Sequence, residues 1–454
     1  MNNHIGIVGI GVMGSNIALN FSDNYTDVSV YNKSQEKIDK LISEDASNNI
    51  SGFTNLEQFV KSIPKPRRVL MLVPSGEATI SVAENLFNFM EKRDTLIDGG
   101  NAYYLDSIDL GKRCRKQGIE FIGMGISGGE TGARTGPALM LGHEEEVPKD
   151  LISMINKIAA EADGLECVGL YKGFGTGHFV KMLHNGIEYA EMQILAEAYN
   201  ILRNAGFDNI AASEFFNNLK KENQSSYLIE ITSRILKTQK DGEYFIDVIK
   251  PIANHKGTGK LTVETSLNYG FPLPSIFEAF NARVESNYQK IWPITTKNIK
   301  MEIDPNTLKE SIYFSRLSTL TQGILFIEYF SKQENLEIRI EDVMQNWLEG
   351  CIIRSDLLKE IKSFLKDGHP NKSIVEAGQI QNNLDSRLKN TKDLVSNCIE
   401  HNIPTPVMFS SLNWYLNSSL EFNPSSLIQA QRDYFGAHTV QLHESDEFLH
   451  LNWD

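Results

Sequence analysis

Short apolar runs rich in β-branched residues alternate with helix-like segments over the first 175 or so residues. Such runs are typical of buried parallel strands, and the segments between them are long enough for crossover helices. The alternation predicts a doubly wound α/β domain. The predicted strands are HIGIVGI (4–10), VSVY (28–31), RVLMLV (68–73), TLIDGG (95–100) and IEFIGM (119–124).

Long helical periods replace this alternation from about residue 176, as in residues 192–206 and 315–333. Several of these segments are hydrophobic on more than one side, which predicts burial in a helical bundle or at a subunit interface. Beyond about residue 418 the chain reads as irregular, with NPSS at 423–426 and GAH at 436–438. We therefore expect an α/β domain (1–175), an all-helical domain (176–418) and an extended tail (419–454).

The composition narrows the possible partners. With 44 Lys and Arg against 58 Asp and Glu, the formal charge is -14, and no basic run suits a nucleic-acid backbone. The four cysteines lack the spacing of a zinc site or a disulfide framework. There is no leader-like segment and no stretch of 18 apolar residues, so we expect a cytoplasmic protein without membrane contact.

A glycine motif points to a cofactor. Gly9, Gly11 and Gly14 form G-x-G-x-x-G after the first predicted strand and before a helix-like segment. In a Rossmann-like domain these glycines permit a tight turn, close approach of a dinucleotide pyrophosphate and packing of helix on strand. The amides at the start of that helix, around Val12 and Met13, would bind the phosphates. The alternative is a glycine-rich turn without a ligand.

The end of the second predicted strand, VYNKS, bears on the choice of coenzyme. An NAD-specific site usually places Asp or Glu there to bind the ribose hydroxyls. This chain instead has Asn32, followed by Lys33 and Ser34, which suits a 2′-phosphate because no carboxylate repels it. NADP is favoured and NAD stays possible, since Lys33 could equally be a solvated residue at the strand end.

The segment KMLHNGIEY (181–189) gathers reactive side chains on a predicted helix. Lys181, His184, Asn185, Glu188 and Tyr189 stand at i, i+3, i+4, i+7 and i+8, and so share one face. A solvated face with a Lys-to-Glu ladder is the ordinary alternative. This segment by itself does not decide between the two.

Longer motifs give the chain a family resemblance. They are IDGGNAYY (97–104), GISGGETGARTGPALM (125–140), GHFVKMLHNGIEYAEMQ (177–193), HKGTGKLT (255–262), GCIIRS (350–355) and SLIQAQRDYFGAHT (426–439). In this order and spacing they resemble decarboxylating 6-phosphogluconate dehydrogenase over essentially the whole chain. The resemblance implies oxidation and decarboxylation of 6-phosphogluconate to ribulose 5-phosphate and CO2, with reduction of NADP, in the pentose phosphate pathway.

The resemblance also implies roles for individual residues and a homodimer whose tail reaches into the partner subunit. Lys181 would be the general base and Glu188 the general acid, and no metal would be needed. Arg432 and His438 would complete the site of the other subunit. The residues implied to bind substrate are Asn101, Ser127, Gly128, Gly129, His184, Asn185, Tyr189, Lys260, Arg283, Arg432 and His438. Those implied or expected to bind the cofactor are Gly9, Gly11, Val12, Met13, Gly14, Asn32, Lys33, Ser34, Val73 and Asn101.

The chain departs from the usual family pattern at several positions. Pro74 replaces a lysine or threonine, Ala102 a serine, and Leu261 a tryptophan, while Leu141 and His143 replace proline and glycine. The residues that the resemblance assigns as general acid, general base and phosphate-binding residues are all present.

The expected chemistry needs a neutral amine. Oxidation of a secondary alcohol requires a base for the hydroxyl proton, and a lysine with its ordinary pKa of about 10.4 is protonated at neutral pH. Burial of Lys181 would favour its neutral form. Two other functions stay open from the residues: a 3-hydroxyacid dehydrogenase acting on an unphosphorylated acid, and a catalytically silent sensor of nucleotides or sugar phosphates.

Overall fold

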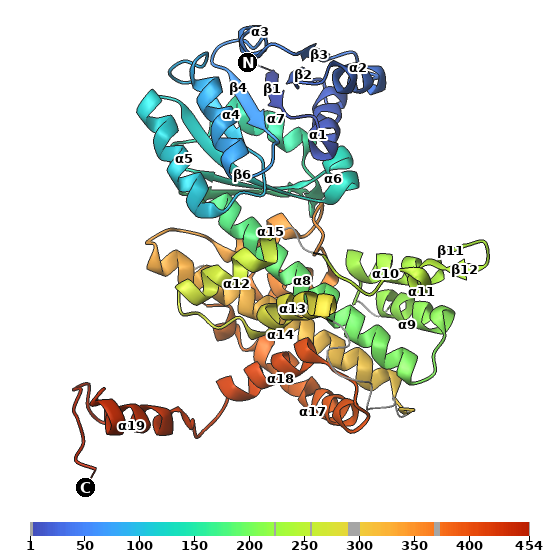
Figure 1. Cartoon of the computed structure of the whole chain (residues 1–454), viewed down its shortest axis with the longest axis vertical. Helices are drawn as coiled ribbons and strands as arrows, with labels where there is room; N and C mark the ends of the chain where they lie inside the picture. Colours follow the sequence, from blue (N-terminus) through green and yellow to red (C-terminus); the bar gives the residue numbers. More distant parts are fainter. Residues whose placement is uncertain (1–2, 222–223, 255–256, 289–299, 367–372, 454) are drawn as a thin grey trace.

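The computed structural model describes residues 3–221, 224–254, 257–288, 300–366 and 373–453. Figure 1 shows an α/β domain above a larger helical domain, with the C-terminal segment extending away from both. Within the described residues no helix is long and apolar enough to cross a membrane. The predicted fold class is therefore confirmed in its α/β domain, its helical domain and its extended tail.

The α/β domain contains an eight-stranded sheet among the residues that the structure describes. Its strand order is β10-β7-β6-β5-β4-β1-β2-β3. Neighbouring strands are parallel except at the β6–β7 pair, so β7 and β10 run opposite to the rest. The strands are β1 (His4–Val8), β2 (Asp27–Tyr31), β3 (Ile50–Phe53), β4 (Arg68–Met71), β5 (Thr95–Asp98), β6 (Glu120–Ser127), β7 (Ala138–His143) and β10 (Val168–Lys172). All five predicted strands are present, whereas β3, β7 and β10 were not foreseen.

Helices cover both faces of this sheet. Side chains of α1, α2 and α7 enter one apolar cluster, and those of α3, α4 and α5 enter another. The helices are α1 (Val12–Asp23), α2 (Gln35–Glu44), α3 (Leu56–Ser62), α4 (Glu77–Phe87), α5 (Tyr104–Gln117), α6 (Gly129–Thr135) and α7 (Lys149–Ile158); the pair β8 (Glu161–Ala162) and β9 (Leu165–Glu166) precedes β10.

The helical domain is built around α8 (Thr176–Asn204) and α14 (Pro305–Gln333), which pack together and are buried over most of their length. Around them lie α9 (Asn209–Lys221), α10 (Tyr227–Lys237), α11 (Phe245–Val248), α12 (Thr258–Asn268), α13 (Pro274–Glu285), α15 (Ile340–Trp347), α16 (Asp356–Lys366), α17 (Gln379–Glu400) and α18 (Pro406–Ser418). Shorter elements are β11 (Gln239–Lys240), β12 (Glu243–Tyr244), η1 (Ser286–Tyr288) and η2 (Ile374–Ala377).

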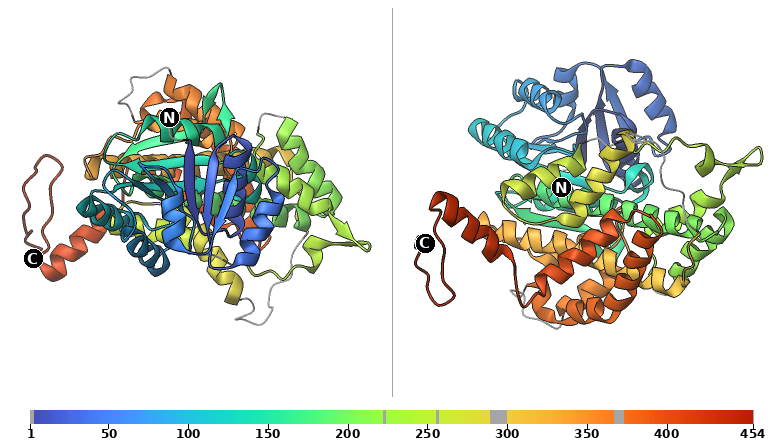
Figure 2. Two further views of the ribbon diagram at one scale, coloured as in Figure 1. Left: turned by 90° about the horizontal axis from the view of Figure 1, so that it is seen from above. Right: turned by 60° about the horizontal axis from the view of Figure 1, so that its bottom comes forward.

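The tail is not irregular throughout, which corrects the expectation from sequence. A helix, α19 (Ser425–Gly436), stands away from the body of the chain, as Figures 1 and 2 show. After α19 the chain folds back on itself, because Val440 and Leu449 form a short antiparallel bridge. The turn signals NPSS and GAH overlap the two ends of this helix rather than replacing it.

Candidate active site

One face of α8 carries the candidate catalytic residues, and that face is buried. Lys181 is 5% exposed, and His184, Asn185 and Tyr189 are also buried, while Glu188 is partly buried. The alternative of a solvated Lys-to-Glu ladder is therefore wrong. A buried row of polar side chains has to be held by specific partners, because an unpaired polar group in the interior is costly.

Glycines bring α8 close to the sheet. A Cβ atom at Gly125 of β6 would lie 2.3 Å from the Cβ of Lys181, and one at Gly177 of α8 would lie 2.4 Å from the carbonyl oxygen of Gly123. No larger residue fits between helix and strand at these two points. The approach places the stem of Lys181 directly against the carboxyl half of β6, where ligands bind in open α/β sheets.

The amine of Lys181 is fixed by its own helix. Its Nζ donates a hydrogen bond to Oδ1 of Asn185 at 2.7 Å and lies 3.3 Å from Nδ1 of His184. Nε2 of His184 is hydrogen-bonded to the hydroxyl of Ser127 at 3.0 Å. Four residues that the sequence placed in one site, three from α8 and one from β6, are thus linked in a single chain of contacts.

Glu188 lies at the other end of this group. Its Oε2 is 3.8 Å from Nδ1 of His184, the same nitrogen that lies 3.3 Å from the amine of Lys181. The guanidinium of Arg283, from α13, lies over the ring of Tyr189 at 3.5 Å from its centroid. Arg283 also acts electrostatically on Glu188, which places a cation beside the candidate acid.

The turn after β6 is formed by glycines that other residues could not replace easily. Gly128 has φ +135° and Gly129 has φ +61°, and a Cβ at Gly128 would lie 2.5 Å from the carbonyl oxygen of Gly350. The amide of Ile352 donates to the hydroxyl of Ser127 at 3.4 Å. The Ser127–Gly129 turn and the GCIIRS segment of the helical domain therefore pack against each other beside the site.

Burial shifts the protonation of all three central groups. It lowers the pKa of the Lys181 ammonium, an effect that the charge of Glu188 opposes only in part. It raises the pKa of Glu188 against the opposing charges of Lys181 and Arg283. The pKa of His184 falls well below its usual value, through burial and then the neighbouring Lys181. Each of the three pKa values is therefore shifted in the direction that favours the uncharged form of its group.

A small cavity adjoins Lys181 where the two domains meet. It is lined by Asn101, Ala102, His178, Lys181, Met182, Asn185, Thr258 and Leu261. Asn101 follows β5, so the cavity joins the predicted substrate residues of both domains. Sequence reasoning missed His178 and Thr258. His178 could have been found, because it stands three residues before Lys181 and so shares its helical face.

The glycine motif has the geometry expected for a dinucleotide. Gly9 has φ +93°, and a Cβ at Gly14 would lie 1.9 Å from the carbonyl oxygen of Gly9, whereas a Cβ at Gly11 would meet nothing within 4 Å. Gly9 and Gly14 thus serve the turn and the packing of α1 on β1, and Gly11 borders open space. Val12, the first residue of α1, is 62% exposed, so the start of the helix is accessible to a ligand.

At the end of β2, Lys33 is exposed and Asn32 is partly buried. The hydroxyl of Ser34 accepts a hydrogen bond from the amide of Lys37 and caps α2. Part of the hydrogen-bonding capacity of Ser34 is therefore used within the protein.

Comparison with known proteins identifies the family. Residues 4–173 match the family model described as the NAD binding domain of 6-phosphogluconate dehydrogenase, and residues 177–453 match that of its C-terminal domain. The chain belongs to the 6-phosphogluconate dehydrogenase family. The predicted family and the predicted decarboxylating dehydrogenase activity are confirmed.

Full-length relatives support this assignment. The decarboxylating 6-phosphogluconate dehydrogenases of Staphylococcus aureus (strain Mu50 / ATCC 700699) and of Staphylococcus epidermidis (strain ATCC 12228 / FDA PCI 1200) are each 36% identical, covering 100% of this chain and 99% of theirs. The solved structure of Plasmodium falciparum 6-phosphogluconate dehydrogenase is 31% identical, with a TM-score of 0.92 over 99% of this chain and 100% of that one.

A second solved structure bears on the alternative dehydrogenase. The 3-hydroxyisobutyrate dehydrogenase (ygbJ) of Salmonella typhimurium is 17% identical and covers 63% of this chain and 95% of its own, with a TM-score of 0.50. At this identity the likeness concerns the fold alone. More than a third of the present chain has no counterpart in that protein.

The residues predicted to bind the substrate phosphate do not all lie together in the structure. Arg283 lies at the site beside Tyr189. The amine of Lys260, on α12, pairs with Glu264 at 3.0 Å and its side chain is 55% exposed. Arg432, on α19, contacts Gln429 in its own helix, and His438 follows that helix in the tail. Of the HKGTGKLT motif, His255 and Lys256 lie outside the described residues.

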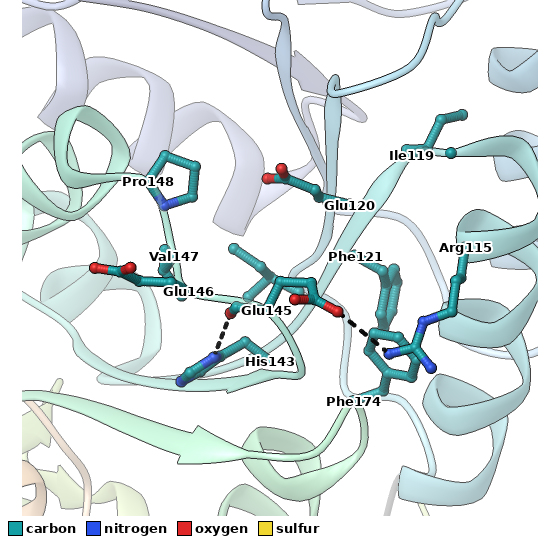
Figure 3. Close-up of a pocket in the computed structure, with 12 residues that line it drawn as sticks. Arg115, Ile119, Glu120, Phe121, His143, Glu145, Glu146, Val147, Pro148 and Phe174 are labelled. Carbon is teal, nitrogen blue, oxygen red and sulfur yellow. Dashed lines mark hydrogen bonds and ion pairs between the residues drawn. The ribbon is translucent and has the colours of Figure 1, made fainter.

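Two of the departures from the family pattern lie at the site and three do not. Ala102 and Leu261 line the small cavity beside Lys181. Pro74 is exposed beyond β4, and Leu141 and His143 lie on β7. His143 lines a separate cavity with Arg115, Glu145 and Phe174, and Figure 3 shows that cavity. None of the candidate catalytic residues is among the residues that line it.

Proposed function

We propose that the chain oxidises 6-phospho-D-gluconate at C3 and releases CO2 to give D-ribulose 5-phosphate, with Lys181 as general base and Glu188 as general acid. The observation that carries this assignment is the single face of α8 on which the two groups lie, each within 4 Å of His184. That face adjoins the carboxyl edge of the sheet, which carries the G-x-G-x-x-G turn.

Lys181 acts first as a base. Burial favours its neutral form, so it can accept the proton of the C3 hydroxyl when substrate binds. The hydrogen bond to Asn185 holds the amine in place for this transfer. The resulting ammonium then donates its proton back to the C3 oxygen as the C1–C2 bond breaks, because that bond's electron pair forms the double bond between C2 and C3.

Glu188 completes the reaction. The carbon that has lost CO2 needs a proton, and a carboxyl with a raised pKa is a suitable donor. As that carbon is protonated, Lys181 takes the proton of the C3 enol hydroxyl, so that the carbonyl of ribulose 5-phosphate forms. Glu188 stands two helical turns from Lys181, so it can reach a different carbon of the same small sugar acid. Asn101, Ser127, Gly128, Gly129, His184, Asn185 and Tyr189 would bind the substrate around these two groups.

NADP is the coenzyme that we assign to the α/β domain. The open space at Gly11 and the accessible start of α1 fit a pyrophosphate, and Asn32 with Lys33 fits a 2′-phosphate better than a bare ribose. The P. falciparum enzyme is described in complex with its cofactor NADP+ and with its substrate 6-phosphogluconate. Val12, Met13, Gly14, Ser34 and Val73 would complete the site. When bound, the nicotinamide accepts the hydride from C3.

The tail supports a homodimer. Arg432 and His438 lie on a segment that stands away from the body of its own chain (Figure 1), and exposed Leu427, Ile428 and Phe435 offer α19 an apolar surface for a second copy. The tail is already folded, because buried Asp433 accepts hydrogen bonds from the Thr439 amide and from the Trp453 indole. Arg432 and His438 would then bind substrate phosphate in the partner subunit.

Turnover of three substrates tests this function. The purified chain is assayed with 6-phosphogluconate, gluconate and 3-hydroxyisobutyrate, with NADP or NAD, while NADPH or NADH formation and trapped CO2 are both recorded. We expect turnover of 6-phosphogluconate with one CO2 per NADPH. Oxidation of 3-hydroxyisobutyrate without CO2 would instead support the 3-hydroxyacid dehydrogenase, and binding of 6-phosphogluconate without reduced coenzyme would support a silent sensor.

A further inference from the structure

His178 connects the catalytic helix to the α/β domain. It lies on α8, one turn before Lys181, and is buried. Its Nε2 lies 3.0 Å from the carbonyl oxygen of Gly100, and its Nδ1 lies 2.6 Å from the hydroxyl of Ser107. Since a carbonyl oxygen only accepts, Nε2 carries the proton, and Nδ1 of the neutral ring accepts from Ser107. One side chain of α8 thus bonds the loop after β5 and the first turns of α5.

The bond to Gly100 bears directly on Asn101. The amide of Gly100 donates to the carboxylate of Asp98 at 3.0 Å, and its carbonyl accepts from His178. That carbonyl shares a rigid peptide plane with the amide nitrogen of Asn101. Fixing the plane therefore fixes the position of the Asn101 Cα atom, from which its side chain leaves the backbone, and Asn101 lines the same small cavity as Lys181.

The sheet leaves space for this ring. A Cβ at Gly123 of β6 would lie 3.0 Å from Nδ1 of His178 and 2.5 Å from the carbonyl oxygen of Phe174. Burial lowers the pKa of His178, which keeps the ring neutral and preserves its one donor and one acceptor. A purely space-filling side chain at this position would not need partners on two separate segments.

We propose that His178 is a positioning residue, which holds Asn101 at a fixed place relative to Lys181 so that both groups address one substrate molecule. This inference rests on the proposed function, because the roles of Asn101 and Lys181 belong to it. His178 itself need not touch the substrate. Its effect on turnover passes through the Gly100–Asn101 peptide.

The test compares His178→Phe, which keeps a ring and loses both hydrogen bonds, with His178→Gln, which can restore a donor and an acceptor. We expect His178→Phe to lower kcat on the order of 100-fold, since misplacement by about 1 Å can cost that much, and to raise KM for 6-phosphogluconate. KM for NADP stays near the wild-type value. His178→Gln recovers most of the loss, and the control His401→Gln, on a histidine outside the site, changes neither constant.

A double-mutant cycle with Asn101→Ala separates positioning from a structural role. If His178 acts through Asn101, His178→Phe lowers kcat much less in the Asn101→Ala background than in the wild type. An equal loss in both backgrounds, with a lower Tm, would overturn the proposal. Where His178→Phe fails to fold, Ser107→Ala removes one partner of the ring; a smaller loss, again dependent on Asn101, supports the proposal, and no change contradicts it.

Failure of this inference differs from failure of the proposed function. If Lys181→Met and Asn101→Ala both retain wild-type turnover, the assigned site is wrong whatever His178 does. If these variants lose turnover while His178→Phe keeps wild-type kcat and KM, the site stands and the positioning role alone is overturned.

Discussion

At the residue scale the site is a matter of protonation. A base must be deprotonated to act and an acid must be protonated. Lys181, with its lowered pKa, therefore becomes competent as pH rises, whereas Glu188, with its raised pKa, loses competence as pH rises. The two requirements together predict a bell-shaped pH dependence of kcat for 6-phosphogluconate, with Lys181 on the acid side and Glu188 on the alkaline side.

The alkaline side can be assigned with one substitution. Glu188→Gln should lower turnover by about 10² to 10⁴, the usual contribution of a general acid, and the residual activity should no longer fall on the alkaline side, because glutamine does not titrate. Glu214→Gln, on an exposed position of α9, serves as the control and should leave the profile unchanged. An alkaline fall at the wild-type pH in Glu188→Gln would mean that another group is responsible.

The individual residues of the site were predictable to different degrees. Lys181, His184, Asn185 and Glu188 follow from helical spacing, because a helix fixes which side chains share a face. The contact of Ser127 with His184 depends on how β6 packs on α8, and only the motif order suggested it. His178 carried no local signal beyond its spacing, since its partners, Gly100 and Ser107, are more than 70 residues away along the chain.

At the scale of elements, α8 also holds the start of another helix. Its Glu197 accepts hydrogen bonds from the amides of Val407 and Met408, at 2.9 and 3.0 Å, in the first turn of α18. These amides have no partners within their own helix, so Glu197 caps α18 from outside. Burial raises the pKa of Glu197 to about 7, although the two amides oppose the shift.

This contact predicts a pH dependence of stability. The carboxyl of Glu197 binds its proton more tightly in the folded chain than in the unfolded chain. Its stabilising contribution to the free energy of unfolding is therefore greatest below its unfolded pKa of about 4.5 and is lost as pH rises towards 7. The free energy of unfolding, measured in urea, should fall by roughly 3 kcal/mol from this group over that window. Glu197→Gln should remove the fall, and exposed Glu400→Gln should not. An equal slope in Glu197→Gln and the wild type would contradict this account.

The elements themselves were predicted unevenly. The five predicted strands are apolar runs that lie side by side in the interior of the sheet. Burial on both faces makes their hydrophobic pattern strong. β3 contains Ser51 and Gly52 and lies at the edge of the sheet, so its pattern is weak. β7 lies inside a motif identified for its chemistry, and its antiparallel direction depends on pairing with β6, which no local pattern specifies.

At the scale of the whole molecule, the homodimer that we propose would complete the site with residues of two chains. A single chain brings Lys181, His184, Glu188 and Arg283 together, but it leaves Arg432 and His438 on a projecting tail (Figure 1). The tail was predicted to be irregular because it contains turn residues, yet hydrogen bonds to Asp433 order it locally.

Mixed dimers test whether the tail completes the partner's site. Lys181→Met and Arg432→Ala chains are each expected to be nearly inactive alone. When they are dissociated together and reassociated in equal amounts, about half of the dimers contain one chain of each kind, and each of these has one intact site. Turnover should recover to about a quarter of the wild-type value. No recovery, with mixed dimers present by mass spectrometry, would place Arg432 in its own chain's site.

The most direct test of the central claim, a neutral amine and a protonated carboxyl acting in sequence from one helix, is a single-turnover experiment that follows NADPH and ribulose 5-phosphate separately. Glu188→Gln should form NADPH at a rate close to that of the wild type while ribulose 5-phosphate forms at least 100-fold more slowly, and Lys181→Met should form neither at an appreciable rate. Equal slowing of NADPH and ribulose 5-phosphate in Glu188→Gln, or rapid NADPH formation in Lys181→Met, would contradict the account.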